Sequence, residues 1–109
     1  MARRKRYVKG RVFITNDAVL TKSAPKKRRV VVTNNDPRKA KVRRVLSAGK
    51  GRNSQKGTPI EKYPDIRKES VVESRTFTQS INGQPLDTTR MRKTKTRLNK
   101  WDRKKLGIK

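Results

Sequence analysis

The hydrophobic residues of this chain gather in short runs that predict β-strands. Residues 7–15 (YVKGRVFIT), 28–36 (RRVVVTNND) and 39–47 (KAKVRRVLS) are rich in β-branched and aromatic residues, which favour strands. The Asn-Asn-Asp-Pro sequence at the end of the second run is typical of a turn. Because little sequence separates the second and third runs, we expect them to form an antiparallel hairpin.

Two further strands are predicted beyond a Gly- and Lys-rich loop at 48–57. Residues 58–63 (TPIEKY) form a short strand that Pro64 ends, and residues 68–78 (KESVVESRTFT) form another. An Asn-Gly pair at 82–83 predicts a tight turn. Four or five short strands in one small chain predict a mainly β fold, a small and strongly curved antiparallel barrel.

The last segment is predicted to form a C-terminal α-helix. It contains no proline, and Met91, Leu98 and Trp101 fall near one helical face. The aromatic residues, Trp101 among them, are expected to serve mainly the core. The predicted organisation is a single domain over residues 1–109 with basic flexible ends: an N-terminal arm (1–7), a β-barrel (8–86) and the helix (87–106).

The charge of the chain bears on whether all of it folds. It has 33 Lys and Arg residues against 8 acids, a formal net charge of +25, and only 29% hydrophobic residues. Such a composition is typical of disorder. The charge is uneven, however, because residues 57–87 carry four cations and five acids, whereas residues 90–109 carry ten cations and one acid. We therefore expect a folded middle section with the cations on the ends and on particular loops.

A charge surplus of this size indicates a polyanionic partner. Phosphates neutralise the self-repulsion of the free protein, so nucleic acid, and RNA first, is the predicted partner. No segment pairs a basic face with an extended apolar one, and no apolar run approaches the roughly 18 residues of a membrane span. We expect a soluble, cytoplasmic protein with no membrane partner. The chain has no Cys and no His, so we predict no cofactor, no metal site and no His-based catalysis.

Lys and Arg side chains bind phosphates by charge, and Arg adds a planar pair of donors. We predict sequence-independent contacts to the nucleic-acid backbone rather than reading of base edges. The candidate binding residues lie in the basic blocks: Arg3, Arg4, Lys5, Arg6, Lys26, Lys27, Arg28, Arg29, Arg43, Arg44, Lys50, Arg52, Lys56, Arg92, Lys93, Lys95, Arg97 and Lys100.

Other interpretations of these motifs remain open. PKKRRV at 25–30 is similar to a nuclear-import signal, although it continues into a valine run that should be buried. GKGRNSQKG at 49–57 lacks the Walker spacing of a nucleotide-binding loop. The cations could also form a merely solvated surface. Glu69 and Glu73 are expected to make local ion pairs with neighbouring cations.

Four stretches together resemble the MazF/PemK family of small SH3-like barrels, many of which are toxins that cut RNA. KKRRVVVTNN (26–35) is similar to the family strand that opens with Lys-Arg-Pro and continues into valines. KVRRVLSAGKG (41–51) resembles the strand that ends in Thr or Ser before a loop. GTPIE (57–61) and KESVVESRTFTQSINGQPL (68–86) resemble the segments that follow.

The resemblance implies a site and an activity. An arginine that begins the second strand and a Thr or Ser that ends the third would act on RNA, with a 2′-hydroxyl attacking the adjacent phosphate. Carried over, Arg28 would stabilise charge on the phosphorane and Ser47 would be its hydroxyl partner. The resemblance also implies a homodimer and an origin in a mobile genetic element.

Three functions therefore stay open. The first is RNA binding through phosphates, which could interfere with a host RNA or ribonucleoprotein. The second is a metal-independent endoribonuclease of MazF type. The third is a structural RNA-binding protein of ribosomal type.

Overall fold

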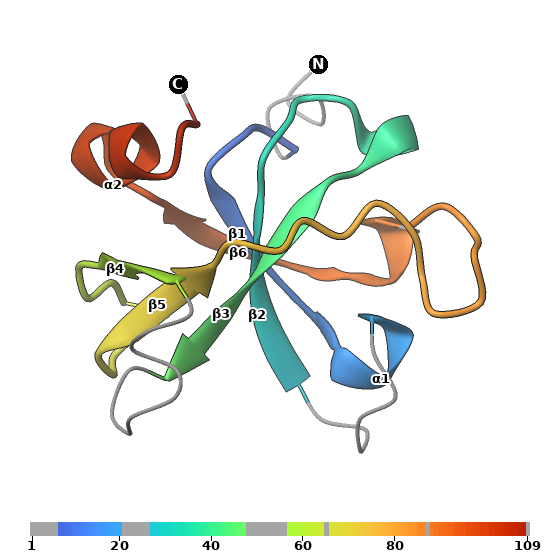
Figure 1. The fold of residues 1–109 in the computed structure, drawn as a ribbon, viewed down its shortest axis with the longest axis horizontal. Helices are drawn as coiled ribbons and strands as arrows, with labels where there is room; N and C mark the ends of the chain where they lie inside the picture. Colours follow the sequence, from blue (N-terminus) through green and yellow to red (C-terminus); the bar gives the residue numbers. More distant parts are fainter. Residues whose placement is uncertain (1–6, 21–26, 48–56, 65, 87, 109) are drawn as a thin grey trace.

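The computed structural model describes residues 7–20, 27–47, 57–64, 66–86 and 88–108, and its main feature is an antiparallel sheet of six strands (Figure 1). The order across the sheet is β4-β5-β3-β2-β1-β6. The prediction of a mainly β fold is confirmed. The strands are β1 (Arg11–Asn16), β2 (Lys27–Val32), β3 (Val42–Ser47), β4 (Gly57–Ile60), β5 (Ser70–Glu73) and β6 (Arg92–Arg97).

Two α-helices and two 3-10 turns complete the described part of the chain: α1 (Asp17–Leu20), α2 (Lys100–Lys105), η2 (Pro37–Lys39) and η3 (Thr88–Arg90). None of the helices in these residues is long and apolar enough to cross a membrane. The radius of gyration is 13.0 Å, which matches the roughly 13 Å of a folded domain of about 100 residues. The chain is therefore compact despite its charge.

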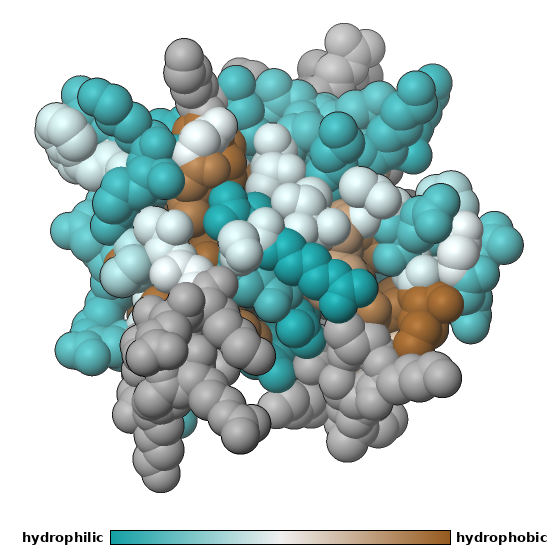
Figure 2. All heavy atoms as spheres, in the orientation of Figure 1, coloured by the Kyte–Doolittle hydropathy of each residue, from teal (hydrophilic) through white to brown (hydrophobic). Residues whose placement is uncertain are grey.

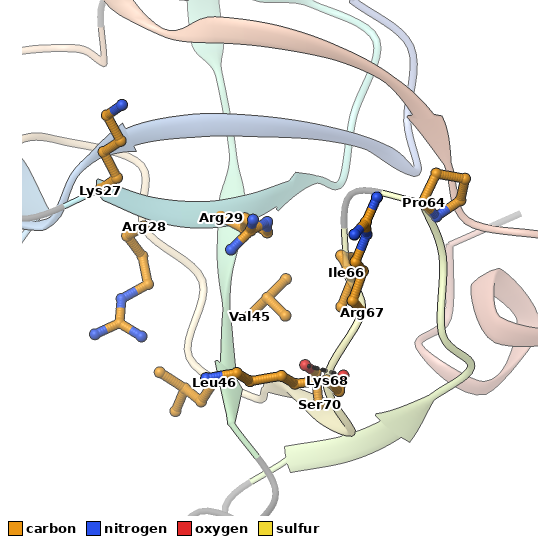
Figure 3. A pocket seen from close by; sticks show the side chains of 10 residues that line it. All are labelled: Lys27, Arg28, Arg29, Val45, Leu46, Pro64, Ile66, Arg67, Lys68 and Ser70. Carbon is orange, nitrogen blue, oxygen red and sulfur yellow. Dashed lines mark hydrogen bonds between the residues drawn. The ribbon is translucent and has the colours of Figure 1, made fainter.

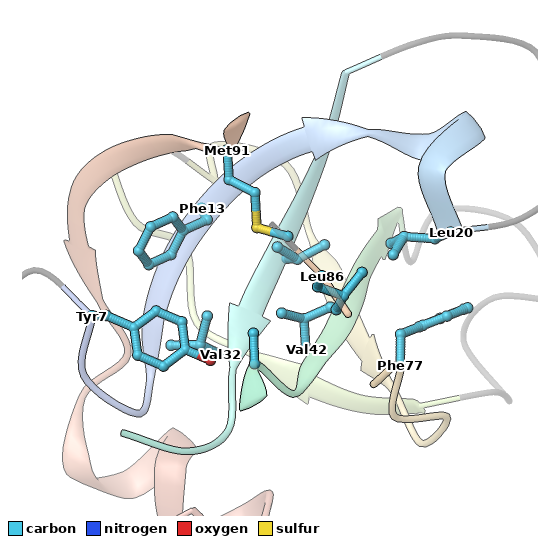
Figure 4. Packing of buried hydrophobic residues seen from close by; sticks show 10 residues of the cluster. Tyr7, Phe13, Leu20, Val32, Val42, Phe77, Leu86 and Met91 are labelled. Atoms are coloured by element: carbon cyan, nitrogen blue, oxygen red, sulfur yellow. The ribbon is translucent and has the colours of Figure 1, made fainter. Parts of the chain in front are cut away.

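The valine run of β2 joins two hydrophobic clusters on opposite faces of the sheet. Val30, Val31 and Val32 are fully buried. Because side chains alternate along a strand, Val30 and Val32 pack in one cluster, with Phe13, Phe77 and others (Figure 4), and Val31 packs in the other. A central strand buried on both faces favours β-branched residues, and this run supplies three in a row.

The predicted hairpin between the second and third strands is confirmed. β2 pairs antiparallel with β3, with Val30 opposite Arg44 and Val32 opposite Val42. The Asp36 carboxylate accepts a hydrogen bond from the Arg38 amide and begins η2. The predicted turn at 82–83 is also present, since the Gly83 amide donates to the Ser80 carbonyl and Gly83 has a positive φ of 80°.

The predicted closed barrel is not observed. Within the described residues the sheet is open, with β4 at one end and β6 at the other. β4 lies so close against β5 that a Cβ at Gly57 would stand 2.3 Å from the Val72 carbonyl oxygen. Only glycine fits at this end of the sheet.

The predicted helix over residues 87–106 is largely wrong. Residues 92–97 form β6, which pairs with β1, and only Lys100–Lys105 are α-helical. The burial of Thr96 and Leu98 and the half-burial of Thr94 follow the two-residue period of a strand. The pattern of large apolar residues at helical spacing was misleading because Trp101 is 64% exposed and contributes little to a buried face.

A buried carboxylate fixes α2 to the rest of the molecule. Asp102 is 1% exposed, and its Oδ2 atom accepts hydrogen bonds from the Tyr63 hydroxyl at 2.5 Å and the Glu61 amide at 2.9 Å. Its Oδ1 atom lies 3.2 Å from the Lys105 ammonium. The Asn99 side chain accepts from the Asp102 amide and caps the helix. A six-residue helix is too short to be stable alone, so these contacts hold it in place.

We predict that Asp102→Ala lowers the free energy of unfolding by about 3 kcal/mol. The substitution removes the acceptor of the half-buried Tyr63 hydroxyl and of the Glu61 amide, and a shielded donor left without an acceptor costs about 1–3 kcal/mol. Urea denaturation followed by circular dichroism measures the change. Lys104→Ala is the control, because Lys104 is exposed on the same helix and its loss should change stability by less than about 0.5 kcal/mol.

The stabilisation that the Asp102 carboxylate provides is expected to depend on pH. Burial alone would raise the pKa of Asp102, but the hydrogen bonds from Tyr63, Glu61 and Lys105 outweigh burial and hold the pKa below its ordinary value. A lowered folded-state pKa adds stability above the unfolded value near about 4, and this stability is lost as the pH falls further. The difference between wild type and Asp102→Ala should therefore shrink in acid. A difference that is below 1 kcal/mol at neutral pH would contradict the proposed anchor.

Candidate nucleic-acid interface

The sheet divides where β3 changes partner. The first half of β3 pairs with β2, and the pairing ends at Val30–Arg44. The second half pairs with β5 on its other edge, with Val45 opposite Val72 and Ser47 opposite Ser70. The residues that begin β2 stay paired with β1. A gap therefore opens between the first half of β2 and the second half of β3.

This gap holds a hollow of about 330 Å³, which we call the notch. Its floor includes Val45 and Ile66, which belong to one hydrophobic cluster. Of the ten described residues that line it, five are cations and none is acidic. The lining residues are Lys27, Arg28, Arg29, Val45, Leu46, Pro64, Ile66, Arg67, Lys68 and Ser70.

Figure 3 shows the cations placed around the notch. Arg28 and Arg29 extend from β2, and Arg67 stands on the opposite side. Lys68 reaches along the lower edge toward β3. The Ser70 hydroxyl donates to the Lys68 carbonyl at 2.9 Å, which fixes the segment that carries both basic residues. The notch can therefore offer charged donors from two sides to one anion.

The two residues of the predicted catalytic pair lie on different strands of the divided sheet. Arg28 is half-buried, with its side chain at the notch. The Ser47 main chain pairs with Ser70, and the side chain of Ser47 lies outside the described part of the structure. Arg29, which stands where the family has proline, is exposed and also lines the notch. The catalytic pair stays a prediction.

Two of the predicted phosphate-binding arginines are bonded inside the protein. Arg44 makes a two-pronged contact with the Glu73 carboxylate, at 2.5 Å from Nε and 3.1 Å from NH2. Its guanidinium also lies 5.3 Å from the centre of the Phe77 ring. Arg43 donates from Nε to the Glu73 carbonyl at 2.6 Å and from NH1 to the Leu106 carbonyl. The prediction that Glu73 pairs with a cation near it in the sequence is wrong, because its ion pair is with Arg44 on the neighbouring strand β3.

The environment of Arg43 agrees with a structural role. Burial lowers its pKa, and the charge of Glu73 partly offsets the effect. A half-buried guanidinium bonded to two main-chain carbonyls holds β3, β5 and the end of the chain together. We therefore assign Arg43 and Arg44 to the architecture of the sheet.

The remaining candidate cations in the described ranges lie on β6 and α2, and none of them lines the notch. β6 is an edge strand that β1 and β2 separate from β3. Its cations, Arg92, Lys93, Lys95 and Arg97, are exposed, and so is Lys100 of α2. Apart from Arg43 and Arg44, the described candidate residues thus fall into two groups, one at the notch and one on β6 and α2.

Some predicted residues lie outside the described ranges. They are Arg3, Arg4, Lys5, Arg6, Lys26, Lys50, Arg52 and Lys56. In the described ranges, no group of three or more acidic side chains is placed to hold a metal ion.

The prediction from sequence missed four basic residues that the fold brings into these regions. Arg67 and Lys68 enter the notch from the segment before β5. Arg11 and Arg103 lie beside Arg97 at the junction of β1, β6 and α2. These contacts join distant parts of the chain, and no local motif in the sequence marks them.

Searches against protein-family models, curated proteins and solved structures find no match for this chain. The similarity to MazF/PemK proteins therefore rests on the short motifs described above.

We predict that Arg44→Ala lowers the free energy of unfolding by about 3 kcal/mol, since it leaves the buried Glu73 carboxylate without its partner. Chemical denaturation measures the loss. Arg44→Met combined with Glu73→Gln should recover most of it, because no unpaired buried charge remains. Lys41→Ala, which removes an exposed cation just before β3, is the control. An Arg44→Ala protein as stable as this control would contradict the structural role.

Proposed function

We propose that the protein binds nucleic acid, and RNA in particular, through phosphate groups held in the notch. The observation that carries this proposal is the set of five cations, with no acid among the described lining residues, around a hollow of about 330 Å³. Like charges around one hollow repel each other, and a bound phosphate relieves that repulsion. Arginine at three of the five positions favours a planar phosphate contact.

The surface agrees with a charged partner. In Figure 2 hydrophilic and intermediate residues make up most of the coloured part of this face, and hydrophobic residues show in separate areas. A large apolar protein partner finds little matching surface on this face. RNA, rather than DNA, is the substrate class that the MazF/PemK resemblance implies.

RNA cleavage of MazF type is a second candidate. It is favoured by the half-buried Arg28, which lies at the start of β2 and at the notch. Prolonged incubation of labelled single-stranded RNA with the protein and a chelator tests it on a denaturing gel. Cut RNA that disappears with Arg28→Gln supports cleavage, and intact RNA removes this candidate while leaving binding in place.

We predict that replacing Arg67 and Lys68 by Gln weakens RNA binding and makes it less salt-dependent. Each phosphate contact contributes about 0.7 to the slope of log affinity against log salt for a single strand, so the slope should fall by about 1.4. Fluorescence anisotropy with labelled single-stranded RNA at several salt concentrations measures it.

The chain offers a matched control for this pair. Arg38 and Lys39 form the same Arg-Lys sequence, are exposed, and do not line the notch. Replacing both by Gln removes the same charge and should leave the slope nearly unchanged. If both double variants reduce affinity and slope equally, binding depends on net charge and the notch is not its site.

A further inference from the structure

The single tryptophan of the chain is exposed on α2, where the notch does not use it. Trp101 is 64% exposed, and the Lys100 ammonium lies 5.3 Å from the centre of its ring. An indole ring has a large apolar surface, and leaving it in water forgoes the stabilisation that burial would give. In a chain with only 29% hydrophobic residues, this exposed ring suggests a ligand.

The fold holds Trp101 in this exposed position. The next residue, Asp102, is buried and fixed by Tyr63 and Glu61, so α2 cannot turn its other side inward. Hollows of about 420 and 510 Å³ adjoin the indole. Arg103 and Ile108 help to line the first, and Glu61 and Lys105 the second. Space for a flat ligand is therefore present beside a ring that the helix cannot withdraw.

Three arginines lie together at the junction of β1, β6 and α2, and one of them, Arg103, also lines a hollow beside the indole. Arg11 of β1 lies opposite Arg97 of β6, and the stems of Arg97 and Arg103 pack over Gly10. A Cβ at Gly10 would stand 2.6 Å from the Arg103 Cδ atom, so the glycine leaves room for the Arg103 stem, and its φ of 88° also favours glycine. Partial desolvation lowers the pKa of the largely exposed Arg97, and the charges of Arg103 and Arg11 lower it further.

Two of these arginines have donors without acceptors in the described structure. The Nε atoms of Arg11 and Arg103 are buried and have no hydrogen-bond partner there, whereas Arg97 Nε donates to the Lys9 carbonyl at 3.1 Å. Buried donors are usually satisfied, and guanidinium groups remain charged at all ordinary pH values. Crowded positive charge together with unused donors is suited to an anion with several acceptor oxygens, such as a phosphate group.

We propose that Trp101 and the three arginines Arg11, Arg97 and Arg103 bind one unpaired nucleotide of a single-stranded nucleic acid. The base stacks on the indole, and an adjacent phosphate accepts hydrogen bonds from the arginines. Arg103 joins the two parts because it lines a hollow beside Trp101 and belongs to the arginine group. A base inside a duplex is already stacked and paired, so this site selects single strands. The inference rests on the proposed nucleic-acid binding and adds a second site, distinct from the notch.

The only tryptophan provides a direct probe, since its fluorescence reports stacking on Trp101 alone. The protein is titrated with a single-stranded RNA oligonucleotide, an abasic strand of the same length and a duplex, while anisotropy of a label on each strand measures binding. We expect the single strand to quench the fluorescence. The abasic strand and the duplex should bind through their phosphates with little quenching.

Two variants separate the base from the phosphate. Trp101→Ala should weaken binding of the single strand about tenfold and leave the abasic strand unaffected. Arg103→Gln should weaken binding of both. Ile81→Ala, which removes another exposed apolar side chain, is the matched control and should change neither. Circular dichroism verifies that each variant is folded.

The outcomes distinguish this inference from the proposed function. Tight binding of the single strand without quenching, or equal quenching by the abasic strand, overturns the stacking site and leaves the notch proposal standing. Absence of binding to every strand at low salt overturns the proposed function itself.

Discussion

The division of the sheet depends on Glu73, which holds β3 at the point where it leaves β2. Its carboxylate binds Arg44 and its carbonyl binds Arg43, so two successive residues of β3 are tied to the end of β5. Both ends of the ion pair are largely shielded, with side-chain exposures of 16% for Arg44 and 9% for Glu73. Shielding from water strengthens such a contact and makes the loss of one partner costly. The notch exists because β3 follows β5 from this point.

The buried valines determine where the cations that precede them can lie. Val30, Val31 and Val32 occupy both faces of the central strand and therefore fix its register. Arg28 and Arg29 then lie in the first half of β2, which does not pair with β3. Asp102 has the same effect on α2, since its burial leaves Trp101 in solvent. In both regions a buried anchor positions side chains that reach the surface.

Much of the fold could be predicted from the sequence because it depends on local patterns. The valine run, the Asn-Asn-Asp-Pro turn and the Asn-Gly turn each act over a few residues, and the structure has the corresponding strands and turns. β6 could not be predicted in this way. Its Thr and cationic residues are in a strand because β1 offers an edge to pair with, and Thr94 donates to the Val12 carbonyl across that edge.

The candidate site could be predicted only in part, because some of its residues are brought together by contacts between distant segments. A charge run identified Lys27, Arg28 and Arg29, which line the notch. It could not distinguish them from Arg43 and Arg44, because the difference lies in Glu73, about 30 residues further along the chain. No local sequence motif marks Arg67, Arg11 or Arg103. Their neighbours in the structure come from distant segments of the chain.

The most direct test of the notch is to locate bound RNA by NMR. Backbone amide resonances are followed while a single-stranded RNA oligonucleotide is added at moderate salt. The divided sheet predicts large shifts at Lys27–Arg29 and at residues 66–68, and small shifts at the equally basic Arg38 and Lys39 of η2. Shifts of similar size at all exposed cations, or largest at η2, would contradict the notch as the phosphate-binding site.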